Sequence, residues 1–148
     1  MKLLVNRNVL GQCEGAIGST QYRHLWFEDH GVQKDIVEDG ELCCAYFMSS
    51  VLHNHDLLRS VHATVKGTIA DMMTSGWTMI DLPQIGAILH WEEFEGHEHI
   101  GIFVGDDKAI SHSDKTRSPQ KHDWLLRSEQ FPEGRALLGI LWHEKLKS

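Results

Sequence analysis

The stretch H-I-G-I-F-V-G-D-D-K-A-I-S-H, from His99 to His112, decides the fold of this chain. Strand-forming residues flank the acidic pair Asp106–Asp107, and two such runs separated by two turn-forming residues indicate a β-hairpin. A two-residue turn pairs Gly105 with Lys108 across the hairpin. This register determines which side chains share a face.

In this register Gly101 lies opposite His112, because side chains alternate between the two faces of each strand. His99 and His112 then become diagonal cross-strand neighbours, about 7 to 8 Å apart between backbones, and one imidazole can bond the other. A three-residue turn would reverse the alternation and place Ser111 on that face instead. The residue that orients His99 therefore depends on one residue of register, and His112 can also be a solvated histidine at the end of a strand.

Upstream of the hairpin, an apolar helical stripe opens at Cys44. Asp39 is the predicted N-cap of a helix from Glu41 to His53. On helical spacing Cys43 lies on a different face, and Cys44 shares its own face with four apolar residues. These are Phe47, Met48, Val51 and Leu52. We therefore expect Cys44, rather than Cys43, to face the core.

The order of a cysteine helix followed by a histidine strand predicts nucleophilic acyl transfer. A thiol in the first helical turn lies at the positive end of the helix dipole, which favours the thiolate. Cys44 is then the nucleophile, His99 the general base and His112 the orienting residue. The backbone N–H of Cys44 is an expected oxyanion donor. The alternative is that Cys44 is a small residue of the core.

The remaining pattern places helices before strands. Helices are expected at residues Leu3 to Leu10, Gln21 to Asp29 and Leu57 to Thr74. Strands are expected at residues Ala87 to Trp91, His99 to Val104, Ala109 to Ser113 and Ala136 to Trp142. An α+β domain with an antiparallel sheet is the predicted fold class. With no linker or composition break, residues 1–148 are expected to form a single domain.

Composition narrows the possible partners. The chain has 21 acidic and 14 basic residues, a formal net charge of -7 with its 11 histidines neutral. A nucleic-acid partner is not expected, because it would require a basic face.

The cysteines and the apolar runs also limit the environment. Three cysteines are an odd number, and bonding adjacent Cys43 to Cys44 would be strained, so free thiols are expected. No apolar run reaches the ~18 residues of a membrane span, and the apolar start breaks after Val5, too early for a signal peptide. The chain is expected to be cytoplasmic, to be exported by a signal-free route, or to be written here without its leader.

Three segments resemble the NlpC-type papain-like cysteine peptidases. C-A-Y-F-M-S-S-V-L, Cys44 to Leu52, resembles the nucleophile helix of that family, and P-Q-I-G-A-I-L-H-W, Pro83 to Trp91, resembles the strand before its histidine. G-H-E-H-I-G-I-F-V-G, Gly96 to Gly105, is similar to its histidine strand and assigns the base to His99 rather than His97. The resemblance covers about residues 38 to 113, and the CHAP amidases are a close relative of that family.

The chain also departs from the family pattern. Cys43 stands where Asp commonly precedes the nucleophile, and Tyr46 stands where Gly is usual. The upstream Tyr-x-Trp-Gly-Gly motif is missing, and the turn before His112 is one residue longer than the common form. The nucleophile and the base remain matched, whereas the substrate pocket and the orienting residue do not follow from the motif.

The resemblance implies a papain-like fold whose nucleophile helix packs on an antiparallel sheet. It also implies a cysteine amidase or endopeptidase that needs no cofactor and acts on peptidoglycan stem peptides. The implied bond is of the kind that joins γ-D-glutamate to diaminopimelate. Delivery to a cell wall without a signal peptide fits a phage-type lysin or an injected effector, for which an inhibitor protein is conceivable.

Three other functions compete with this interpretation. The pair His97/His99 is compatible with a metal-dependent hydrolase, although no C-x-x-C or H-E-x-x-H context accompanies it. A non-catalytic papain-like peptide-binding domain would be expected to lose the Cys or the His. A permuted lipid-directed acyltransferase would place the histidine strand before the cysteine helix, and here the cysteine comes first.

Overall fold

The computed structural model describes residues 1–147 and contains three α-helices, two 3-10 turns and eight strands in that range. The helices and turns are α1 (Val5–Gly15), η1 (Glu38–Gly40), α2 (Cys44–Asn54), α3 (Val65–Thr74) and η2 (Glu144–Lys147). The strands are β1 (Trp26–Asp29), β2 (Val32–Asp35), β3 (Trp77–Met79), β4 (Ile88–Phe94), β5 (His97–Gly105), β6 (Lys108–Ser113), β7 (Ser118–Asp123) and β8 (Leu137–His143).

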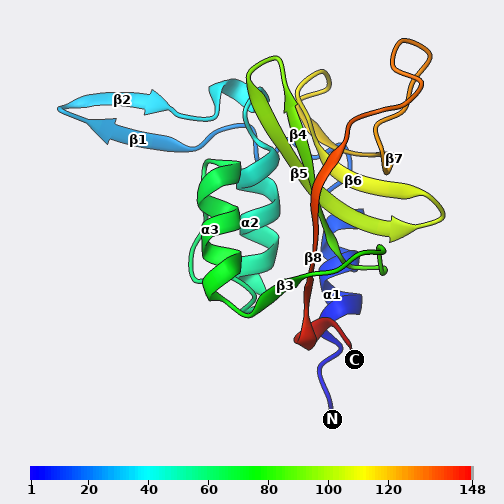
Figure 1. The fold of residues 1–148 in the computed structure, drawn as a ribbon. Coiled ribbons are helices and arrows are strands. Elements are labelled where there is room, and N and C mark those ends of the chain that lie inside the picture. Colours follow the sequence, from blue (N-terminus) through cyan, green and yellow to red (C-terminus); the bar gives the residue numbers. More distant parts are fainter. Residues whose placement is uncertain (148) are drawn as a thin grey trace.

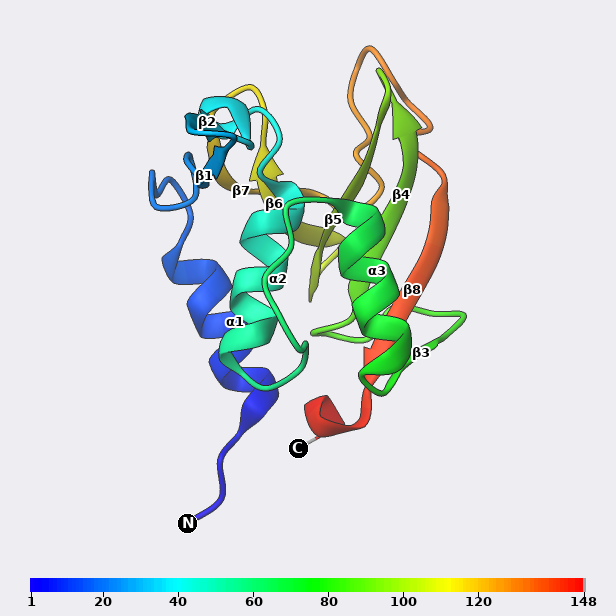
Figure 2. The same ribbon diagram turned by 90° about the vertical axis from the view of Figure 1, so that its left-hand side faces the viewer.

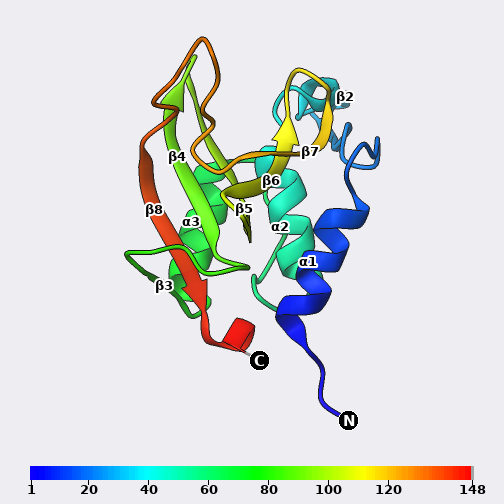
Figure 3. The ribbon, with the colours of Figure 1, turned by 90° about the vertical axis from the view of Figure 1, so that its right-hand side faces the viewer.

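Six strands form one antiparallel sheet in the order β3-β8-β4-β5-β6-β7. Helix α2 packs on β5 and β6, with α1 on one side of it and α3 on the other (Figure 2). Seen from the opposite side, β8 and β4 lie in front of α3 (Figure 3). The predicted α+β class, with N-terminal helices against an antiparallel sheet, is confirmed.

The core lies between α2 and the central strands. Phe47, Met48, Val51 and Leu52 are completely buried, as the helical stripe predicts. They pack with the inward side chains of β4 to β6, among them Ile100, where burial of a large aliphatic side chain stabilises by about 1.5–3 kcal/mol. This packing fixes the first turn of α2 against the start of β5.

The central hairpin has the predicted turn but not the predicted register. Gly105 pairs with Lys108, and Asp106 and Asp107 both have positive φ (52° and 56°), as a two-residue primed turn requires. A β-bulge follows directly, because Phe103 pairs with Ala109 and leaves Val104 as an extra residue on β5. The extra residue reverses the alternation of side chains beyond it.

The expected pairing of Gly101 with His112 is therefore wrong. Since Ile102 pairs with Ile110, Gly101 lies opposite Ser111. The added Cβ of any other residue at Gly101 would meet the Ile110 carbonyl at 2.7 Å and Ser111 Cβ at 2.9 Å. Glycine at this position lets β5 and β6 approach closely, and Ser111 then lies on the same face of the sheet as His99.

The cysteine helix starts later than expected. Helix α2 begins at Cys44, not at Glu41, and its N-cap is Cys43 rather than Asp39. Asp39 has φ 54° and ψ 42° inside η1, and its carboxylate instead accepts a 2.7 Å hydrogen bond from Arg117. Cys44 is consequently the first residue of the helix.

Two other helix predictions are corrected. Residues Gln21 to Asp29 do not form a helix, because β1 and the preceding loop occupy that range, and the β1–β2 hairpin projects from the body (Figure 1). The helix expected from Leu57 to Thr74 is only α3, which Thr64 caps by accepting a 3.0 Å hydrogen bond from the Gly67 N–H. The helix expected at Leu3 to Leu10 exists as α1 and extends to Gly15.

The four predicted strands are present as β4, β5, β6 and β8, whereas β1, β2, β3 and β7 were not predicted. Within the range the structure describes, no helix has the length and apolar character needed to cross a membrane.

Candidate active site

A cavity of about 1250 Å³ opens where α2 begins, and its walls come from several elements. The start of α2, the start of β5 and the segment 124–136 that connects β7 to β8 all lie at the same end of the molecule (Figure 2). Among the reactive and titratable side chains that line it are Cys44, His99, Ser111, His112, His122 and Arg135. The structure thus brings the two predicted reactive residues, Cys44 and His99, to one cavity.

Cys44 is half-buried at the edge of this cavity, whereas Cys43 is buried and directs its sulfur to the Val37 carbonyl at 3.8 Å. The backbone N–H of Ile100 lies near enough to the Cys44 sulfur to lower its pKa, and Ile100 directly follows His99 in β5. The thiol therefore lies near the start of β5.

Burial raises the pKa of the Cys44 thiol to about 11. Backbone N–H groups of Ile100, Ala45 and Cys44 itself lower the pKa, and so does the charge of Arg135, but burial outweighs all of them. The expectation that the helix start alone favours a thiolate is not met, because the sulfur is taken out of water. The free protein therefore holds a neutral Cys44 thiol near neutral pH.

The imidazole of His99 is oriented by Ser111. His99 Nε2 lies 2.8 Å from Ser111 Oγ. His112 occupies the opposite face because of the bulge at Val104, so it does not orient His99 as the unbulged register predicts. Ser111, which the reversed register would place beside His99, is the residue that orients it.

His122, which sequence reasoning missed, extends this chain of hydrogen bonds. Its Nε2 lies 2.6 Å from Ser111 Oγ, and its Nδ1 lies 2.7 Å from the backbone carbonyl of Asp123. Arg127 holds the Asp123 carboxylate with two hydrogen bonds of 2.8 and 2.9 Å. The only sequence signal for His122 was the segment P-Q-K-H-D, which follows a turn and could form a further strand beside β6.

The Asp123 carbonyl determines which group donates and which accepts in each hydrogen bond that links His122, Ser111 and His99. A carbonyl only accepts, so Nδ1 of His122 carries the proton and a neutral His122 has an accepting Nε2. The Ser111 hydroxyl therefore donates to His122 and accepts from the Nε2–H of His99. Nδ1 of His99 is left as a lone pair, which is the form that a general base requires.

Trp91 packs against the imidazoles of both His99 and His122. Its ring centroid lies 5.2 Å from that of His99 and 5.7 Å from that of His122, and its Nε1–H donates to the Trp124 carbonyl at 2.9 Å. Burial, followed by the nearby charges of His122, Arg135 and His112, lowers the pKa of His99 to about 3. The imidazole is consequently neutral across the neutral pH range.

His112 is nearly inaccessible, with 2% of its surface exposed, and packs against Phe47 with ring centroids 6.3 Å apart. Neither of its ring nitrogens has a hydrogen-bond partner among residues 1–147. Burial and the positive charge of Arg23 lower the pKa of His112 to about 4, against a smaller opposing effect of the Ser113 backbone. It lines the cavity from the helix face of the sheet, as an unpaired neutral ring.

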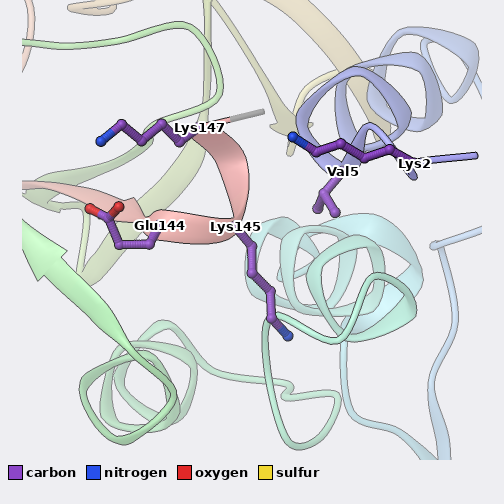
Figure 4. A pocket seen from close by; sticks show the side chains of 5 residues that line it. All are labelled: Lys2, Val5, Glu144, Lys145 and Lys147. Atoms are coloured by element: carbon purple, nitrogen blue, oxygen red, sulfur yellow. The ribbon is translucent and has the colours of Figure 1, made fainter.

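The described residues contain no cluster of ligands that would support a metal-dependent hydrolase. His97 is exposed, and no group of three or more His, Cys, Asp or Glu side chains within residues 1–147 has the arrangement of a metal site. A second pocket, of about 380 Å³, lies between the N-terminal segment and η2 and is lined by three lysines, a glutamate and Val5 (Figure 4). Neither a cysteine nor a histidine lines that pocket, so it does not repeat the thiol and imidazole of the larger cavity.

No protein-family model matches this chain, and no curated protein matches it.

Proposed function

We propose that this protein is a cysteine amidase or endopeptidase with a papain-like arrangement, in which Cys44 is the nucleophile and His99 the base. The observation that carries the proposal is the directed hydrogen-bond chain that leaves Nδ1 of His99 unprotonated in the cavity that contains the Cys44 thiol. A thiol, a base and a residue that orients the base are the minimum set for covalent acyl transfer.

The first half of the reaction forms a thioester. Cys44 Sγ attacks the carbonyl carbon of the amide while its proton passes to His99 Nδ1. Because burial keeps both groups neutral beforehand, charge separates only during the attack. The C–N bond then breaks, and the same proton moves from His99 to the leaving amine. The Ser111 hydrogen bond supports the imidazolium by accepting from its Nε2–H.

The second half returns the enzyme to its starting state. His99 removes a proton from water, the resulting oxygen attacks the thioester carbonyl, and the proton returns to the departing Cys44 sulfur. The backbone N–H groups of Cys44 and Ala45 are free for the carbonyl oxygen, because the first N–H groups of a helix have no intrahelical acceptor. Both lie close enough to the sulfur to lower its pKa.

The substrate class comes from the resemblance of residues 38 to 113 to the NlpC-type peptidases. It supports peptidoglycan stem peptides, cut at an amide such as that between γ-D-glutamate and diaminopimelate. Nothing in the composition selects this substrate. An all-L protein chain is expected to fit poorly, because the stem peptide contains D-residues.

The test is mass spectrometry of purified muropeptides after incubation with the protein. We expect cleavage of a single amide that releases a new amine, no cleavage by Cys44→Ala, and little degradation of casein under the same conditions. Efficient cleavage of casein with unchanged muropeptides would retain the thiol mechanism and discard the cell-wall substrate.

A further inference from the structure

The cavity contains a cation whose hydrogen-bond donors are unused. Arg135 is half-buried, and its guanidinium lies over the ring of Phe94, 4.7 Å from the centroid. Within residues 1–147 its side chain forms no ion pair and no hydrogen bond. A half-buried guanidinium that lies over an aromatic ring and has no polar partner leaves its five N–H donors available to a ligand.

The backbone around Arg135 is fixed by the segment that carries it. The Arg135 N–H donates to the Leu125 carbonyl at 2.8 Å, and the next N–H, of Ala136, donates to Glu92 Oε1 at 3.0 Å. Gly134 has φ +70°, and a Cβ there would lie 1.9 Å from the Leu125 carbonyl oxygen. These contacts orient Arg135 before any ligand arrives, which lowers the entropic cost of binding.

Carboxylates surround Arg135 without pairing to it. Seven of them line the cavity with only three cations, counted over the described residues. Three, on Glu92, Glu95 and Asp114, lie near enough to act on the charge of Arg135, yet none comes within 4.0 Å of it. Glu92 is instead occupied with the Ala136 N–H. The cation is therefore stabilised by its surroundings and still open to a ligand.

Arg135 also lies close to the proposed nucleophile. It lines the same cavity as Cys44 and His99, and its charge acts on both the thiol and the imidazole. A group that contacts Arg135 is then within reach of the reacting sulfur. Planar guanidinium groups bind carboxylates in a bidentate manner, which adds geometric selectivity.

We propose that Arg135 forms a carboxylate subsite beside Cys44, so that the preferred substrate carries a free carboxylate next to the scissile amide. This inference rests on the proposed function and specifies its substrate. A γ-linked glutamyl residue, whose α-carboxylate is free, has this chemistry, and its α-carboxamide does not. The acidic outer lining would receive amino groups further along the same peptide.

The first test uses small alkylating agents and needs no peptide substrate. Iodoacetate carries a carboxylate and iodoacetamide does not, and both react with the Cys44 thiolate, so the ratio of their rates cancels changes in the pKa of the thiol. We expect Arg135→Gln to lower the iodoacetate-to-iodoacetamide ratio by about 10- to 100-fold, the range of a lost charge-assisted contact. The ratio for Arg135→Lys should lie between those of the wild type and Arg135→Gln.

Rates are read at Cys44 by peptide mass spectrometry. Arg59→Gln is the matched control, because it removes an arginine outside the cavity whose side chain bonds the Thr74 carbonyl. Its ratio should equal that of the wild type. An unchanged ratio in both Arg135 variants, with the iodoacetamide rate and the circular dichroism spectrum preserved, overturns the subsite. If Arg135→Gln fails to fold, the ratio in Arg135→Lys decides alone.

The second test compares two synthetic peptides that differ only in a γ-D-glutamate α-carboxylate or its carboxamide. The wild type should prefer the carboxylate by at least about tenfold in kcat/KM, and Arg135→Gln should lose this preference. Equal cleavage of both peptides by the wild type overturns the subsite and leaves the proposed function intact. If neither peptide is cut, the proposed substrate class fails, and the alkylation ratio still decides whether Arg135 binds a carboxylate.

Discussion

Replacing His112 should change how the stability of this protein depends on pH. The ring is 2% exposed and has no hydrogen-bond partner within the described residues, so the native state favours its neutral form. Its pKa falls from the ordinary 6.5 to about 4. Between those values the unfolded chain binds a proton that the native state does not, so stability falls as the pH decreases.

The size of the effect follows from the two pKa values. One pKa unit corresponds to about 1.4 kcal/mol, so His112 removes about 3 kcal/mol from the free energy of unfolding between about pH 7 and about pH 4. His112→Leu replaces the ring with an apolar side chain of similar volume next to Phe47. The variant should match or exceed wild-type stability near neutral pH and should lose about 3 kcal/mol less on acidification.

Urea unfolding followed by tryptophan fluorescence, repeated across this pH range, measures the difference directly. His99, with a pKa of about 3, contributes a similar loss in both proteins and cancels in the comparison. His30→Gln is the control, since the His30 side chain is 96% exposed and no desolvation is relieved by removing it. If His112→Leu loses as much stability as the wild type on acidification, the ring is not held neutral in the native state and the assigned burial is wrong.

Three further outcomes test the proposed chemistry. Cys44→Ala should abolish hydrolysis and labelling by a peptide-like electrophile while Cys43→Ala stays largely active; the reverse would mean that the buried thiol is the nucleophile. Ser111→Ala should lower kcat/KM by about 10- to 100-fold, the range expected for losing a hydrogen bond to a charged imidazolium. His112→Leu should retain most activity. A larger loss in His112→Leu than in Ser111→Ala would restore His112 as the orienting residue. Activity should persist after chelation and dialysis and disappear with iodoacetamide, because the thiol and His99 supply the chemistry; recovery on adding zinc would point to a metallohydrolase instead.

The features predicted correctly from sequence are those with a strong local pattern. The apolar stripe after Cys44 and the turn at Asp106–Asp107 are both present, because side-chain spacing and turn chemistry determine them. The order of helices before strands also gave the α+β class. The positions of Cys44 and His99 in one cavity follow from these elements.

The bulge at Val104 could not be read in the same way. Two residues oppose one there, and no residue type in F-V-G specifies which strand carries the extra position. The result changed the partner of His99 from His112 to Ser111. A single inserted position outweighed a correct turn assignment, because side chains in a strand alternate with a period of two.

The mistaken helix before α2 has a different cause. The helix expected from Gln21 to Asp29 covers Trp26 and Phe27, and both side chains are more than half exposed on the projecting β1–β2 hairpin. The turn there is His30–Gly31, where both residues have positive φ (50° and 78°), and its histidine is not among the usual turn signals. All four residues of β1 are exposed, so no alternation of buried and exposed side chains marks it as a strand.

The direction of the hydrogen-bond chain gives the site a built-in sensitivity to acid. If His122 took up a proton, both of its ring nitrogens would donate, and the Ser111 hydroxyl would have to turn its proton toward His99 Nε2. His99 would then carry its own proton on Nδ1 and could not accept one from Cys44. Burial lowers the pKa of His122 more than Asp123 raises it, which keeps this ring neutral. The Asp123 carbonyl therefore sets which nitrogen of His99, three hydrogen bonds away, can act as a base, and a backbone carbonyl leaves no trace in the sequence.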